Sequence, residues 1–308
     1  MGTPEIALDT LSAINEKHEV VGVISQPDKP SGRGNKLTPT PVKALAQELG
    51  LDVYQPERIK SKESFELIQR LNPDIIVVIA YGQILPARVL DYPKHGTINI
   101  HGSLLPQYRG ASPIQQAILN GDKITGITIM QMDVGMDTGD MILKSEIEIP
   151  TGYTSGDLFK TMGELAPEPL LEALEQIEKG TVVRTPQGDD FTHAPMISKE
   201  MGNIDWNKPS DQIVNLIHGL NPWPGAYTYI GGDVLKVWKA REVSDIITTG
   251  DTVAGQVIKA SPKEGIIIKT ANTLVRLTEV QKKGSKKLPD TEFIKGNPIK
   301  EGEICSMM

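Results

Sequence analysis

Cysteine is almost absent from this 308-residue sequence, and the one cysteine, Cys305, lies near the C-terminus. A single thiol cannot form an internal disulfide, which favours a reducing compartment and predicts a cytoplasmic protein. One cysteine and five histidines also offer no zinc-ligand spacing, so we expect no metal. Long apolar runs are missing too: the longest, Ile75–Ala80, is far shorter than the roughly 20 residues of a membrane span. No basic segment followed by an apolar one opens the chain, which argues against a secretory signal.

Two nucleotide-binding signatures are also missing. No Walker A sequence occurs, and Gly32-x-Gly34 lacks the third glycine and the strand-to-helix context of a dinucleotide fingerprint. Assignment as an NAD-dependent oxidoreductase would therefore rest on an analogy of fold alone.

The net charge of −7 is distributed unevenly. Residues 208–308 carry 14 Lys and Arg against 11 Asp and Glu, a net charge of +3, which leaves 18 against 28, or −10, for residues 1–207. A basic back half indicates an anionic partner for that half. A chance excess of surface lysines is the alternative.

Short apolar runs alternate with helix-like stretches through residues 1–180. Pro73–Ala80 is typical of a parallel strand buried on both faces, and Thr97–His101 is predicted as the next strand. The alternation predicts an α/β catalytic domain with a Rossmann-like, open, mostly parallel sheet and helices on both faces. Gly2-Thr3-Pro4 has the composition of a strand-to-helix turn, so we expect this domain to lack its first strand.

The pattern changes after residue 180. Residues 181–207 have weak periodicity with scattered Gly, Pro, Asp and Thr, and they are predicted as a linker. Within residues 208–308, a helix over Ser210–Gly219 precedes five short strand-like runs separated by turn residues. This arrangement predicts a small OB-like β-barrel.

Asn99 and His101 alternate with apolar residues on the predicted strand, so their side chains share one face near its carboxyl end. An amide beside an imidazole can stabilise an oxyanion while a proton moves, although a structural polar pair is the alternative. Asp133 and Asp137 follow the predicted strand Ile124–Met132, and we expect their loop at the same sheet edge. One of these carboxylates could orient the histidine, or the loop could be a simple Asp/Gly turn.

Two basic segments could contact a phosphate backbone. The long polar loop Gln26–Leu37 carries Lys29, Arg33 and Lys36. The other segment is a cluster of four lysines, Lys282, Lys283, Lys286 and Lys287. Solvated loops are the alternative for both segments.

Three stretches together resemble the signature of the folate-dependent formyltransferases: Asn99–His101, Ser103–Gly110 and the Asp133–Asp140 loop. The resemblance extends to the Gln26–Gly34 loop. It also includes Ala80–Pro86 and Asn221–Pro224, so it covers almost the whole chain.

The resemblance implies catalytic roles for Asn99, His101 and Asp137. Arg33, with Lys29 and Lys36, matches the loop that engages the acceptor end of tRNA, and the four C-terminal lysines would hold the tRNA body. The residues that it implies for folate binding are Ser103, Leu104, Leu105, Pro106, Tyr81, Gly82, Ile84, Leu85 and Asp133.

The implied reaction moves a formyl group from 10-formyltetrahydrofolate to the amino group of methionyl-initiator tRNA. It needs no metal, membrane or obligate protein partner. Superfamily members that formylate a nucleotide-sugar amine or a glycinamide nucleotide, or that hydrolyse formylfolate, are alternatives, and the basic Arg33 loop favours tRNA. A non-catalytic RNA-binding protein would not need Asn99, His101 and Asp137 to converge.

Overall fold

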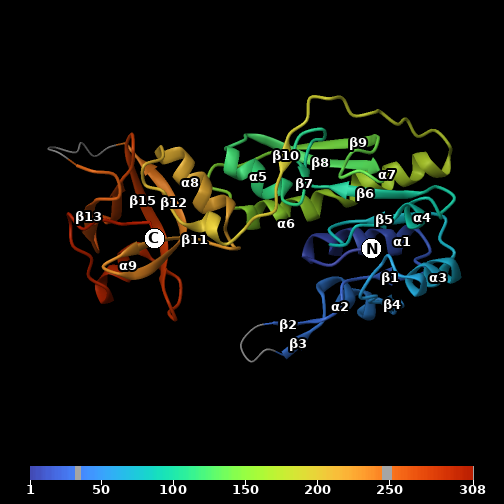
Figure 1. Ribbon diagram of the computed structural model, residues 1–308, viewed down its shortest axis with the longest axis horizontal. Helices are drawn as coiled ribbons and strands as arrows, with labels where there is room; N and C mark the ends of the chain where they lie inside the picture. Colours follow the sequence, from blue (N-terminus) through green and yellow to red (C-terminus); the bar gives the residue numbers. More distant parts are fainter. Residues whose placement is uncertain (32–35, 245–251, 308) are drawn as a thin grey trace. The chain divides into compact units, whose positions relative to one another are not determined.

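The computed structural model describes residues 1–31, 36–244 and 252–307 (Figure 1). The chain divides into two compact units. The N-terminal unit comprises Met1–Pro113, Ile124–Ile147 and Phe159–Ala194, and the C-terminal unit comprises Ile114–Lys123, Glu148–Leu158 and Pro195–Met308. None of the helices in the described ranges combines the length and apolar character needed to cross a bilayer.

The main sheet of the N-terminal unit has the strand order β5-β6-β8-β9. Strands β5 and β6 are parallel, with Val78 beside Asn99. Strand β8 is antiparallel to β6, with Thr128 beside His101. The predicted Rossmann-like α/β architecture is confirmed, with β8 as an antiparallel addition. The bounds are β5 (Ile76–Val78), β6 (Thr97–His101), β8 (Ile124–Gln131) and β9 (Met141–Glu148).

A second, parallel pair consists of β1 (Val23–Ile24) and β4 (Val53–Tyr54). The first residues of the chain lie between β1 and β5. The Gly2 N–H donates to the Ile24 carbonyl at 3.0 Å, and Gly2 also forms a parallel bridge with Ile79. A cavity of about 330 Å³ beside Gly2 is lined by residues of β1, of β5 and of two helices, α1 (Leu8–Lys17) and α7 (Pro167–Glu178).

Helices pack against both faces of β5, because alternate side chains of a strand point in opposite directions. Ile76 and Val78 pack in one apolar cluster with residues of α3 and α4. Val77, which does not belong to that cluster, lines the cavity together with Ile76 and with residues of α1 and α7. The bounds of these helices are α1 (Leu8–Lys17), α3 (Lys62–Leu71), α4 (Ala87–Leu90) and α7 (Pro167–Glu178).

Helix α2 (Pro41–Glu48) begins at a start signal that is visible in the sequence. The Thr40 hydroxyl accepts the Lys43 N–H at 3.2 Å, and Pro41 stands at the first position of α2. A capping hydroxyl followed by proline is a local signal for the start of a helix. The remaining elements up to residue 194 are η1 (Glu5–Ala7), α2 (Pro41–Glu48), α5 (Pro113–Asn120), α6 (Ser155–Leu165), β2 (Lys29–Ser31), β3 (Lys36–Thr38), β7 (Arg109–Gly110) and β10 (His193–Ala194).

The C-terminal unit is built on an antiparallel sheet with the strand order β11-β12-β15-β14-β13, and β16 pairs with β15. Helix α8 contributes Ile213 and Ile217 to the core that this sheet covers. Its elements are η2 (Glu200–Gly202), α8 (Ser210–Gly219), β11 (Ala226–Ile230), β12 (Asp233–Val243), β13 (Val257–Ser261), β14 (Gly265–Lys269), β15 (Leu274–Lys282), β16 (Leu288–Pro289) and α9 (Asp290–Gly296).

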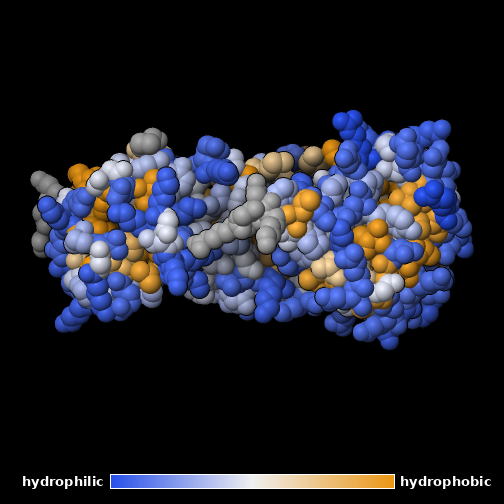
Figure 2. All heavy atoms as spheres, turned by 90° about the horizontal axis from the view of Figure 1, so that it is seen from below, coloured by the Kyte–Doolittle hydropathy of each residue, from blue (hydrophilic) through white to orange (hydrophobic). Residues whose placement is uncertain are grey.

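Among the described residues, no strand pairing joins β11 directly to β13. Isolated bridges connect Tyr229 with Ser306 and Gln256 with Ile304, so the C-terminal residues lie between the two edges of the sheet. The predicted C-terminal β domain is thus present as a sheet. Figure 2 shows apolar residues reaching the surface in patches surrounded by hydrophilic ones.

The predicted linker, residues 181–207, divides at Ala194. Strand β10 pairs in parallel with β7, which attaches the stretch up to Ala194 to the N-terminal unit. Beyond it, Ile204 and Trp206 belong to the core of the C-terminal unit. The Trp206 Nε1–H donates to the Thr228 hydroxyl at 3.0 Å.

Candidate functional site

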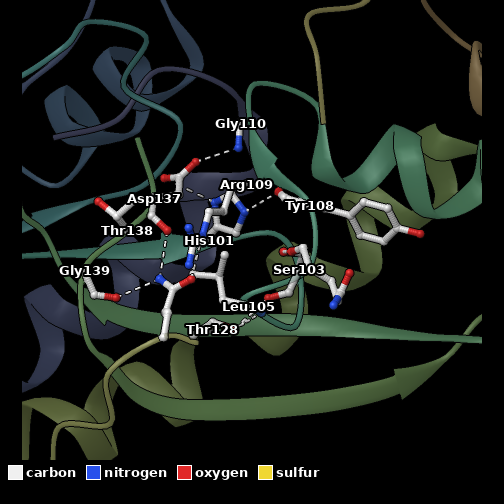
Figure 3. A network of polar contacts seen from close by, with 12 residues as sticks. His101, Ser103, Leu105, Tyr108, Arg109, Gly110, Thr128, Asp137, Thr138 and Gly139 are labelled. Carbon is white, nitrogen blue, oxygen red and sulfur yellow. Dashed lines mark hydrogen bonds and ion pairs between the residues drawn. The ribbon is translucent and has the colours of Figure 1, made fainter. Parts of the chain in front are cut away.

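His101 is the last residue of β6, and its ring is almost completely buried. Its Nε2 lies 2.9 Å from the Tyr108 carbonyl oxygen. A carbonyl oxygen can only accept, so Nε2 must carry a hydrogen. Nδ1 faces Asp137, whose Oδ1 lies 3.6 Å away (Figure 3). The two groups therefore face each other across a gap slightly longer than a direct hydrogen bond.

Asn99 precedes His101 by two residues on β6, so both side chains project from the same face of the strand. Its backbone lies between Val78 of β5 and Met130 of β8. The structure thus pairs His101 with Asp137 and places Asn99 one step back on the same face. The catalytic roles of the three residues stay predictions.

The loop that carries Asp137 begins near the amino end of β6, whereas we expected it at the carboxyl end. Because β8 is antiparallel to β6, its last residue, Gln131, pairs with Ile98 near the start of β6. The loop then turns back, and the Gln131 N–H donates to the Asp140 carbonyl at 2.8 Å. The expectation of a shared edge was wrong because the apolar pattern of a strand does not reveal its direction.

Asp137 has a φ of 53°, in the left-handed region that is uncommon for residues other than glycine. The Gly110 N–H donates to its Oδ2 at 2.8 Å. Gly110 itself has a φ of 126°, and a Cβ there would lie 2.6 Å from the Ala194 carbonyl oxygen. Only glycine fits this close approach, so the motif's last residue supplies a backbone donor to the carboxylate.

The backbone of the Ser103–Pro106 stretch, which is predicted to bind folate, is hydrogen-bonded to the side chain of Thr128 on β8. The Thr128 hydroxyl donates to the Ser103 carbonyl at 2.7 Å and accepts the Leu105 N–H at 3.0 Å. Ser103 and Leu105 are fully buried, whereas Leu104 and Pro106 are half-buried. Sequence reasoning missed Thr128, because its role depends on the register of β8 opposite His101.

The predicted folate residues after β5 differ in exposure. Tyr81 and Leu85 are buried with the core around β1 and β5, and burial raises the pKa of Tyr81 to about 12. Gly82 is exposed, and Ile84 is 85% exposed. The Asp133 carboxylate, on the other loop, is also exposed and accepts the Thr138 hydroxyl at 2.7 Å.

The basic Gln26–Leu37 stretch, which we expected to be a loop, contains an antiparallel hairpin of β2 and β3. Lys29 is exposed and stands opposite Thr38. The backbone of Lys36 pairs with Ser31. Arg33 lies outside the described residues, so its predicted role stays a prediction.

The base of this hairpin is anchored by Asp28. Its Oδ1 accepts from Gln55 Nε2 at 2.6 Å, and its Oδ2 accepts from Lys43 Nζ at 2.6 Å. The hydrogen bond from Gln55, followed by that from Lys43, holds the pKa of Asp28 below its usual range. These contacts tie the hairpin to α2 and to the segment after β4.

The four C-terminal lysines have different surroundings. Lys282 Nζ lies 2.8 Å from the Asp233 carboxylate. Lys287 Nζ lies 3.5 Å from the centre of the buried Trp238 ring, within the range of a cation–π contact. Lys283 and Lys286 are exposed.

Sequence reasoning missed a cluster of Arg109, Gln187 and Phe191, which contacts the Asp137 loop through Gln187. Arg109 is buried, and its guanidinium lies 4.3 Å from the centre of the Phe191 ring. Its Nε donates to Gln187 Oε1 at 2.9 Å. Arg109 belonged to the recognised motif, but its partners lie in the predicted linker, where the sequence offers no signal of contact.

Comparison with known proteins gives consistent results. Residues 2–174 match the family model described as "Formyl transferase", and residues 196–298 match "Formyl transferase, C-terminal domain". The methionyl-tRNA formyltransferase of Clostridioides difficile is 47% identical over 306 residues, which cover 99% of this chain and 98% of that protein. The one from Ruminiclostridium cellulolyticum is 46% identical over 305 residues, with coverage of 98% and 97%.

A solved structure supports the fold. WlaRD, a sugar 3N-formyl transferase, aligns with a TM-score of 0.65 at 18% identity, over 92% of this chain and 97% of that one.

Proposed function

Because this chain belongs to the formyl transferase family, we propose that it transfers the formyl group of 10-formyltetrahydrofolate to the amino group of methionyl-initiator tRNA. The geometric observation that supports this reaction is the pairing of His101 with Asp137 beside Asn99. The near-complete match to methionyl-tRNA formyltransferases supports charged tRNA as the acceptor.

In the proposed reaction, the uncharged methionyl amine attacks the formyl carbon and forms the new C–N bond. The carbonyl electron pair moves to oxygen, and the resulting oxyanion accepts hydrogen bonds from the Asn99 amide and from the Nδ1–H of protonated His101, because the Nε2–H is already donated to Tyr108. Collapse breaks the bond between this carbon and N10 of the folate. The amine gives up one proton and N10 takes one up, so the proton count balances.

Asp137 has two proposed tasks. Its carboxylate stabilises the protonated imidazole that it faces, and it takes part in removing the proton of the attacking amine. The hydrogen bond from His101 Nε2 to Tyr108 fixes the ring, so Nδ1 is the nitrogen that faces the carboxylate.

The folate is proposed to bind along the Tyr81–Leu85 and Asp133–Asp137 loops. Three apolar side chains in these loops, Ile84, Val134 and Met136, are 85%, 78% and 65% exposed. Apolar surface next to a few polar groups suits a flat ring system such as a pterin.

The tRNA is proposed to contact the Gln26–Leu37 stretch through Lys29, Arg33 and Lys36, and the C-terminal unit through its lysines. The C-terminal sheet is proposed to be a small OB-like barrel, closed by the residues that bridge Tyr229 and Gln256. Such an activity belongs in the cytoplasm, where a single cysteine stays reduced.

The decisive experiment incubates the chain with 10-formyltetrahydrofolate and methionine-charged initiator tRNA, and then measures formylmethionine. We expect formylation, and a slower reaction with the charged elongator tRNA. Binding of charged tRNA without formyl transfer would instead favour a non-catalytic RNA-binding protein. Transfer to a nucleotide-sugar amine but not to tRNA would assign the chain to another branch of the family.

A further inference from the structure

We propose that Gln187 is a positioning residue for the catalytic carboxylate: it holds the Asp137 loop in the conformation that faces His101. This inference rests on the proposed function of the site. Gln187 lies within residues 181–207, which the sequence predicts as a linker, and it is half-buried.

The side-chain amide of Gln187 uses both of its N–H groups on the catalytic loop. Its Nε2 lies 2.8 Å from the Asp137 carbonyl oxygen and 2.7 Å from the Gly139 carbonyl oxygen. One side chain therefore binds the backbone on either side of Thr138, which fixes the local path of the loop.

The orientation of this amide is set by Arg109. A guanidinium can only donate, and Arg109 Nε lies 2.9 Å from Gln187 Oε1, so the amide nitrogen must point toward the loop. The Phe191 ring packs against the same guanidinium and limits its movement. Arg109 and Phe191 therefore hold the amide of Gln187 in one orientation.

Asp137 needs such support because its backbone lies in the left-handed region, with a φ of 53°. A residue other than glycine keeps this conformation only where its surroundings determine it. Three contacts surround this position: Gln187 binds the Asp137 carbonyl, the Gly110 N–H binds the carboxylate, and the Thr138 hydroxyl binds Asp133. Of these three, the contact of Gln187 is the one that holds the peptide group after Asp137 directly.

Removal of the amide donors should leave the segment around Gln187 in place. Thr185 exchanges two hydrogen bonds with Met141, each of 2.9 Å. Further along, the Thr192 carbonyl accepts the Arg109 N–H at 2.9 Å, and the Thr192 hydroxyl accepts the Tyr108 N–H at 2.9 Å. These bonds flank Gln187 on both sides, so its contribution can be tested in a folded protein.

The test uses Gln187→Glu in the full chain. Glutamate keeps the size and the acceptor for Arg109 but cannot donate to the two carbonyls when ionised. We expect kcat for formylation to fall about 10- to 100-fold, because small displacements of a catalytic group have effects of this size. The KM values for both substrates and the melting temperature should stay close to those of the wild type.

Gln69→Glu is the matched control, because it makes the same chemical change at an exposed position on α3. Its kcat should equal that of the wild type. If Gln187→Glu also keeps the wild-type kcat, or if it lowers activity only by raising KM or by unfolding the protein, the positioning role is wrong.

A double variant shows whether Gln187 affects the reaction through Asp137 or independently of it. If Gln187 acts by placing Asp137, then Asp137→Ala and Asp137→Ala/Gln187→Glu should have single-turnover rates within about twofold of each other. If the double variant instead loses activity by the product of the two single-variant losses, the inference is wrong. The activity of the wild type distinguishes failure of the proposed function from failure of this inference. If the wild type does not formylate tRNA, the proposed function is wrong. If the wild type is active and Gln187→Glu is equally active, only this inference is wrong.

Discussion

The two ring nitrogens of His101 have different partners, and this difference assigns them different tasks. Nε2 donates to the Tyr108 carbonyl and so orients the ring, while Nδ1 faces Asp137. A histidine held at one nitrogen can change its proton at the other without turning. The geometry therefore suits a residue that must be charged at one stage of a reaction and keep its place throughout.

At this scale we predict the effect of removing either donor to the oxyanion. Asn99→Ala and His101→Ala should each lower kcat by roughly 10²- to 10³-fold, because one preorganised donor typically contributes that much. Single-turnover formylation assays measure the loss. The dissociation constant for charged tRNA, measured by filter binding, should barely change, since neither side chain is expected to hold the tRNA body. A variant with near-native turnover would remove that residue from the proposed mechanism.

At the scale of elements, the β2–β3 hairpin is the clearest example of a segment held at its base. Asp28 receives hydrogen bonds from Lys43 of α2 and from Gln55. The carboxylate thus connects the start of the hairpin to two segments that follow it in the chain. Its orientation toward any ligand depends on this connection.

We therefore predict that Asp28→Ala loosens the hairpin and weakens the use of tRNA. The KM for charged tRNA should rise by about 3- to 10-fold, in the range of one lost hydrogen bond of ordinary strength, while the KM for 10-formyltetrahydrofolate stays constant. Initial-rate kinetics with each substrate varied in turn would measure both. Glu66→Ala, which removes an exposed carboxylate from α3, is the control. An equal rise of the tRNA KM in both variants would contradict the role of the anchor.

Elements with local signals were predictable from the sequence, and those that depend on distant partners were not. Helix α2 follows from Thr40 and Pro41, and β6 matches its predicted range because its alternation is intrinsic to five residues. The direction of β8 was not accessible, since apolar runs look alike in either direction. Gln187 was missed for the same reason: it stands in a weakly patterned stretch, and only folding brings it to Asp137.

At the scale of the whole molecule, each unit has its own core, and the core of the C-terminal unit lies beside a buried histidine. In the C-terminal unit, His218 of α8 is buried and its Nε2 accepts the Ala240 N–H at 3.4 Å. Burial, which is the largest effect, and the charge of Lys239 lower the pKa of His218, whereas Asp157 acts in the opposite direction. The folded unit therefore favours the neutral ring.

This preference predicts a loss of stability in acid. The unfolded chain binds a proton to His218 near its ordinary pKa of 6.5, and the folded chain resists it until a lower pH. The free energy of unfolding should therefore fall between about pH 7.5 and pH 5.5. Urea unfolding followed by tryptophan fluorescence would measure the change. His218→Gln keeps an acceptor for Ala240 and should flatten this part of the profile, whereas an unchanged profile would assign the effect to other groups.

The division of the predicted linker at Ala194 also bears on how such proteins recombine. If relatives exchange their C-terminal segments at a crossover before residue 181, a foreign peptide is joined to the catalytic sheet and Arg109 loses its native glutamine partner. A crossover just after Ala194 would transfer the sheet together with the peptide that supports its carboxylate. Chimeras built at the later junction should keep activity. Those built at the earlier junction should fold but turn over slowly, because they lack the native residues 181–194 that support Asp137.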